Sequence, residues 1–138
     1  YIFRQRHMKR REFLRIFAAS PLISGVQPKL SEAGEEGAMY GLISKIKAAH
    51  GKGEELSAVL LAGNRDMPGC LSYVVARDTA DADAIWVTEV WADQASHQAS
   101  LQLPAVKDAI AKGRPLITGF GERSVTTPVG GVGLPRHR

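Results

Sequence analysis

The order of strand-like and helix-like segments between residues 39 and 126 constrains the fold more than any other feature. Four segments are predicted to be strands: 39–48, where alternate residues share one face, 71–78, 85–91, which is rich in aromatic and β-branched residues, and a last one near 115–126. Helical spacing predicts two helices between them, over 54–67 and 93–113, the second interrupted at Leu103-Pro104. The order strand, helix, strand, strand, helix, strand predicts an α+β fold, a ferredoxin-like split βαβ sandwich with two helices on one face of an antiparallel sheet.

The segment 85–91, "IWVTEVW", is apolar on both faces of the predicted sheet. Val87 and Trp91 point to one side, whereas Trp86 and Val90 point to the other. Helices on one face leave the second face in water, an apolar patch on the order of several hundred Å². Burial against the same face of a second copy removes this exposure, and we therefore expect a homodimer.

The net charge of +4 comes from the N-terminal segment. Residues 1–28 carry six Lys or Arg and one acid, whereas residues 29–138 carry twelve basic and thirteen acidic side chains. The body of the chain therefore offers no basic surface for nucleic acid, and we expect no nucleic-acid partner.

The run "RREFLR" at 10–15 is followed by eleven weakly apolar or small residues, 16–26. This layout resembles a twin-arginine export signal, with Arg15 where Lys is usual. The apolar run is too short for a stable membrane span, which takes about 20 residues. We expect residues 1–33 to be an N-terminal extension that carries this signal, and the protein to be exported to the periplasm. A packed basic helix is the alternative, but it requires an amphipathic period that this run lacks.

Three segments, "MYGLISKIKAAHGKGEEL", "MPGCLSYVVARD" and "IWVTEVWADQASHQASLQLPAVKDAI", resemble the antibiotic biosynthesis monooxygenase or quinol monooxygenase family. The likeness covers residues 39–128, which leaves 129–138 as a C-terminal tail. Its most specific elements are Pro68-Gly69-Cys70 and Glu89-Val90-Trp91, the latter leading to the helix with His97. The resemblance implies a dimeric α+β barrel with a pocket between sheet and helices. It also implies monooxygenation of a quinol or other electron-rich aromatic by dioxygen, without metal or flavin.

The residues themselves agree with an absence of cofactors. No glycine-rich turn opens a helix after a strand, and Cys70 is the only cysteine. The histidines lack metal-ligand spacing: His7, His50, His97 and His137. We therefore expect neither a metal nor an organic cofactor, and we do not favour Cys70 and His97 as a nucleophile pair.

An oxygenase without a cofactor needs a base, a polar group that stabilises the substrate anion, and aromatic walls. We predict His97, Trp91 and Glu89 as catalytic residues. His97 is the candidate base, because the ordinary pKa of histidine is near neutrality. A partly exposed histidine without a catalytic role is an equal alternative. Trp91 is either a pocket wall or core, and Glu89 must find a partner, such as Arg77 or Arg123, or shift its pKa.

Four further residues are predicted to bind substrate: Tyr73, Asn64, Val87 and Leu101. Tyr73 can donate to a bound oxyanion or simply pack across strands with Tyr40. Asn64 is a polar pocket group or a surface helix end. Val87 shares a strand face with Glu89 and Trp91, and Leu101 shares a helix face with His97.

Two other functions remain open. The first is a non-catalytic protein that binds a small aromatic, since a fold does not imply turnover. The second is haem binding, because related ferredoxin-like dimers bind haem through a histidine in the segment that corresponds to 105–114. That segment contains no histidine here, which argues against haem ligation.

Overall fold

A computed structural model describes residues 37–136, so the export-signal segment predicted for 1–33 lies outside the described residues. The strands are β1 (Tyr40–Ala48), β2 (Cys70–Arg77), β3 (Ala84–Trp91) and β4 (Ile117–Thr126). The helices are α2 (Gly53–Gly63), α3 (Gln94–Ser100) and α4 (Pro104–Gly113), followed by the short 3-10 helix η2 (Arg114–Leu116). The element order and the break in the second predicted helix agree with the sequence patterns.

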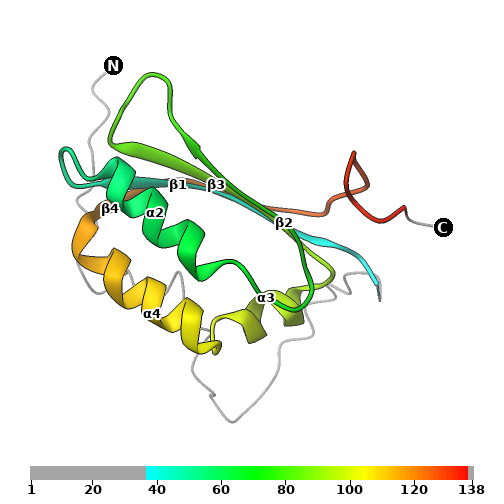
Figure 1. Ribbon diagram of the computed structural model, residues 1–138. Coiled ribbons are helices and arrows are strands. Elements are labelled where there is room, and N and C mark those ends of the chain that lie inside the picture. The colour runs from blue at the N-terminus through cyan, green and yellow to red at the C-terminus, as the bar shows by residue number, and fades with distance from the viewer. Residues whose placement is uncertain (1–36, 137–138) are drawn as a thin grey trace, which may run out of the picture.

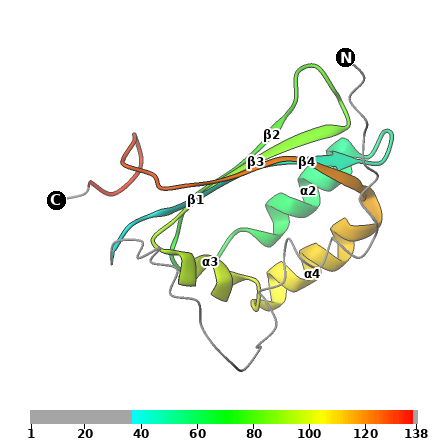
Figure 2. The same cartoon turned by 180° about the vertical axis from the view of Figure 1, so that it is seen from behind.

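The four strands form one antiparallel sheet in the order β2-β3-β1-β4. Helices α2 and α4 lie side by side across one face, and α3 lies near the end where β3 finishes (Figure 1). Figure 2 shows the same two layers from behind, with all three helices on one side of the sheet. The predicted ferredoxin-like α+β fold is therefore confirmed.

Two predicted boundaries are wrong. Helix α2 ends at Gly63 rather than near residue 67, with Asn64 as its C-cap. Pro68 disfavours helical backbone at the residue before it, so the helical spacing of Met67 does not extend the helix. The last strand begins at Ile117 rather than at 115, because Pro115 lies in η2.

The hydrophobic core lies between the sheet and the helices. Leu56 from α2 packs with Ile85 and Val87 from β3, and all three are at most 2% exposed. Fully burying a side chain of this size contributes about 1.5–3 kcal/mol. The core therefore fixes the helices over one half of the sheet, and the remaining end of that face carries the polar side chains described below.

The second face of the sheet has no helix over it in the described part of the chain (Figure 2). Ile43 is 37% exposed and Val74 51% exposed on this face. At its polar end, Asp78 accepts hydrogen bonds from Trp86 Nε1 at 2.9 Å and pairs with Lys45 Nζ at 2.9 Å. The prediction that β3 is apolar on both faces agrees with this arrangement. Within residues 37–136, no helix is both long and apolar enough to cross a membrane.

Candidate functional site

The turn at Pro68-Gly69-Cys70 and the N-cap of α3 together position His97. Gly69 has φ +81°, and a Cβ at this position would collide with the side chain of Ser96. The Gly69 carbonyl accepts a hydrogen bond from Ala92 N at 2.8 Å, and Asp93 Oδ1 accepts one from Ser96 N at 2.7 Å. This local geometry places the start of α3 against the β2 turn, because only glycine fits beneath Ser96.

His97 points into the protein from α3. Its side chain is 13% exposed, and its Nε2 lies 3.8 Å from Glu89 Oε2. The imidazole centroid lies 5.2 Å from that of Tyr40 and 5.4 Å, edge-on, from that of Trp91. The imidazole therefore sits against two aromatic rings and one carboxylate, with a small part of its side chain still exposed.

Glu89 is the carboxylate of this cluster. Its side chain is 11% exposed, and its Oε2 accepts a hydrogen bond from Trp91 Nε1 at 2.9 Å. Arg77 is not its partner, because the Arg77 guanidinium pairs with Glu54 at 3.6 Å. The partners of Glu89 are therefore Trp91 on the same strand and His97 on α3. The strand pattern alone did not predict the contact with His97.

The environment sets the proton affinities of this pair. Burial raises the pKa of the Glu89 carboxyl, while the Trp91 hydrogen bond and the charge of Arg123 oppose the rise. Burial, and then the charge of Arg123, lower the pKa of His97 below its ordinary value. His97 is therefore a neutral imidazole at neutral pH, able to accept a proton, with a carboxylate close enough to stabilise the resulting cation.

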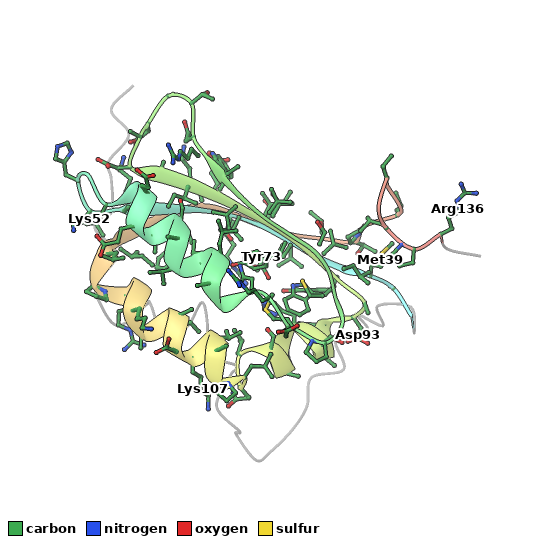
Figure 3. All side chains as sticks on the ribbon, viewed as in Figure 1. Met39, Lys52, Tyr73, Asp93, Lys107 and Arg136 are labelled. Carbon is green, nitrogen blue, oxygen red and sulfur yellow. The ribbon has the colours of Figure 1, made fainter. Side chains whose placement is uncertain are left out.

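Tyr73 and Asn64 extend the cluster towards α2. Tyr73 lies opposite Glu89 in the register of β2 and β3, between the sheet and the helices (Figure 3). Burial and the Glu89 charge raise the pKa of the Tyr73 hydroxyl, and the nearby Asn64 amide partly offsets this. Asn64 Nδ2 is nevertheless buried without a full hydrogen-bond partner among the described residues. A buried donor of this kind is unfavourable unless another acceptor reaches it.

The other predicted site residues lie in the packing around this cluster. Trp91 is 1% exposed. Its buried indole donates a hydrogen bond to Glu89 and contacts the His97 ring edge-on. Val87 belongs to the hydrophobic core with Leu56 and is not brought to the polar cluster. Leu101 is the partly buried C-cap of α3.

Tyr40 and Cys70 also lie in this region, although neither was predicted to be a catalytic or substrate-binding residue. Both lie opposite Trp91, one on each neighbouring strand. The sequence signals were the Pro68-Gly69-Cys70 motif and the position of Tyr40 on the same strand face as Leu42 and Ile46. Burial and the Glu89 charge raise the pKa of the Cys70 thiol, which therefore stays protonated and is a poor nucleophile.

No group of three or more His, Cys, Asp or Glu within residues 37–136 is arranged to hold a metal ion. The chemistry this cluster offers is proton transfer. A neutral imidazole stands beside a buried carboxylate, and an amide donor is available nearby to an anion.

The model of the antibiotic biosynthesis monooxygenase family matches residues 39–112. The chain belongs to this family. A structure from Chloroflexus aurantiacus assigned to the same family is 58% identical, with a TM-score of 0.69, and the match covers 70% of this chain and 99% of that one.

More distant structures share only the fold with this chain and its family. A Caulobacter crescentus protein assigned to it is 23% identical, with a TM-score of 0.61, over 67% of this chain and 92% of that one. SnoaB, a cofactor-independent oxygenase from Streptomyces nogalater, is 18% identical, with a TM-score of 0.57, over 68% of this chain and 96% of its own. No curated protein matches the chain.

Proposed function

We propose that this protein is a cofactor-independent monooxygenase that acts on a quinol or another electron-rich aromatic. The observation that carries the proposal is the pair of His97 and Glu89, 3.8 Å apart and largely buried, with Tyr73 opposite Glu89 and the Asn64 amide beside the Tyr73 hydroxyl. Family membership supports an oxygenase, and SnoaB provides an example of cofactor-independent oxygenation on the same fold.

The proposed reaction begins with proton transfer. Neutral His97 removes a proton from a ring hydroxyl of the substrate, and Glu89 stabilises the imidazolium that forms. The Asn64 amide, beside the Tyr73 hydroxyl, donates a hydrogen bond to the substrate oxyanion through its remaining N–H. The rings of Tyr40 and Trp91 keep this part of the protein apolar, so the anion is held by few, fixed partners.

The electrons come from the substrate. The aromatic anion passes one electron to dioxygen, and the resulting radical and superoxide combine to form a carbon–oxygen bond. His97 returns its proton to the peroxide. The oxygen–oxygen bond then breaks, one oxygen leaves as water with the hydrogen of the ring carbon, and the other stays as a carbonyl. A quinol and one dioxygen thus give one hydroxyquinone and one water.

An oxygen-uptake experiment tests this function. The full-length protein is mixed anaerobically with a naphthoquinol, and ¹⁸O₂ is then admitted while uptake is followed. We expect uptake above the protein-free rate, with one dioxygen consumed and one labelled oxygen retained per product. Saturable binding of the quinol without uptake above the blank would instead identify a non-catalytic binding protein.

We also propose that the protein is a homodimer that buries the uncovered face of the sheet. Ile43 and Val74 are 37% and 51% exposed on this face, and Trp86 and Val90 lie beside them, partly exposed. Exposed apolar residues on one continuous sheet surface favour association with an identical surface through a two-fold axis.

Export remains a proposal that rests on the sequence at 10–26. A full-length chain with Arg10→Lys and Arg11→Lys is expected to accumulate in the cytoplasm of a bacterial host, because the paired arginines are the recognised part of a twin-arginine signal. The unaltered chain is expected in the periplasmic fraction. Equal distribution of both proteins after fractionation would contradict export by this route.

A further inference from the structure

A β-bulge in the edge strand β4 decides which charge faces the His97 and Glu89 cluster. Phe120 lies opposite Ile46, and Arg123 lies opposite Ser44, so β4 has one residue more than β1 over this interval. Ile46 and Ser44 lie on the face of the sheet that the helices cover. Residues opposite each other in a ladder share a face, so Arg123 is on that face too.

The extra residue reverses the expected alternation. In a regular strand, residue 122 would follow Phe120 on the helix-covered face, and Arg123 would point away. Instead, Gly121 and Glu122 together stand opposite Lys45, and the Glu122 charge acts on Lys45 at the other face. The bulge therefore directs an arginine rather than a glutamate towards the cluster, which is a known use of bulges near functional sites.

Arg123 is exposed and makes no hydrogen bond or ion pair with any other residue of the described chain. Its charge nevertheless acts on both Glu89 and His97. The residue two positions further along the same face, Val125, is 57% exposed. Within residues 37–136, the β4 side of this sheet face is thus exposed, and it presents a guanidinium without an ion-pair partner on the same face as an exposed apolar side chain.

We propose that Arg123 determines substrate specificity by binding an anionic group, a carboxylate or an ionised hydroxyl, on the aromatic substrate. This inference rests on the proposed function and narrows its substrate class to anionic aromatics. A guanidinium binds a carboxylate through paired hydrogen bonds, and Val125 offers apolar contact to an adjoining ring. The reacting hydroxyl then lies further in, towards His97.

Binding of two matched probes tests the proposal without any turnover. The full-length protein is titrated calorimetrically with 2-naphthoate and with 2-naphthamide, which share a ring system and differ in charge. We expect the unaltered protein to prefer 2-naphthoate. Arg123→Gln should weaken 2-naphthoate binding about tenfold and leave 2-naphthamide binding unchanged, whereas Arg123→Lys should retain part of the preference.

Two further variants separate a local role from the general effect of charge. Arg77→Gln removes the same charge from an exposed arginine that pairs with Glu54, and it should leave both affinities unchanged. Exchanging the two charges of the bulge, Glu122→Arg with Arg123→Glu, keeps the net charge and should weaken 2-naphthoate binding more than Arg123→Gln does. Circular dichroism and thermal unfolding confirm that each variant is folded.

The inference is overturned by any of three results: no preference for 2-naphthoate in the unaltered protein, equal losses in Arg123→Gln and Arg77→Gln, or no effect of the charge exchange. Because the titrations require no oxygen, they are independent of the uptake experiment. A charge-selective protein that consumes no oxygen would keep this inference and refute the proposed function.

Discussion

Replacing His97 with Gln is expected to lower kcat for quinol oxygenation by about 10²–10⁴-fold, the range typical for loss of a general base. Glutamine fills much of the same space but cannot accept the substrate proton. Stopped-flow or oxygen-electrode kinetics on the quinol measures the effect. The matched control is His50→Gln, which alters an exposed histidine paired with Asp83 at 3.1 Å, outside the cluster.

The pH dependence of kcat/KM is a second test of the role of His97. Burial and Arg123 lower the pKa of His97, so the neutral, active form persists below the ordinary value of 6.5. The acid limb of kcat/KM is therefore expected below pH 6.5, and activity should fall as pH drops through it. In His97→Gln this limb should disappear from the residual rate.

The same shift makes a contribution to stability with a definite sign. Because the folded protein holds His97 neutral more strongly than the unfolded chain does, this residue destabilises the fold as pH falls from 6.5 towards its lowered pKa. The raised pKa of Glu89 acts in the opposite direction, destabilising the fold as pH rises from 4.5.

A His97→Gln variant with unchanged kcat and an unchanged acid limb would remove His97 from the mechanism.

Replacing Val74 with Asp is expected to convert the proposed dimer into a monomer. Val74 is 51% exposed on the uncovered face, so the monomer tolerates the change, whereas the interface must bury two unpaired carboxylates. An uncompensated buried charge costs about 3–5 kcal/mol, which corresponds to a dimer weaker by more than about 100-fold. Sedimentation over a concentration series measures the association constant.

Leu61→Asp is the matched control for this interface. Leu61 is 53% exposed, nearly as much as Val74, but it lies on α2, on the opposite side of the sheet. This variant should retain the dimer. If the unaltered protein sediments as a monomer, or if both variants dissociate alike, the uncovered sheet face is not the interface.

The sequence determined the layers of this protein. Alternation along 39–48 and 85–91 predicted the strand faces correctly, because side chains in a strand alternate regardless of what packs on them. The N-cap Asp93 marked the start of α3 and Pro104 the start of α4, since caps and proline act within a few residues. The end of α2 was missed, because the apolar spacing continues to Met67 although the helix ends at Gly63.

Only the tertiary structure decided how the charged groups meet. Glu89 was predicted to need a partner, but its pairing with His97 arises from the contact between α3 and the end of β3, which no local pattern encodes. Val87 shares the strand face of Glu89 yet lies in the core, because the helices cover that part of the sheet. The face of the sheet on which Arg123 lies depends on one extra residue in β4. The pattern of apolar residues in the sequence does not reveal such a bulge. Local rules thus determined the elements, whereas the approach of distant segments and the register between strands determined the site.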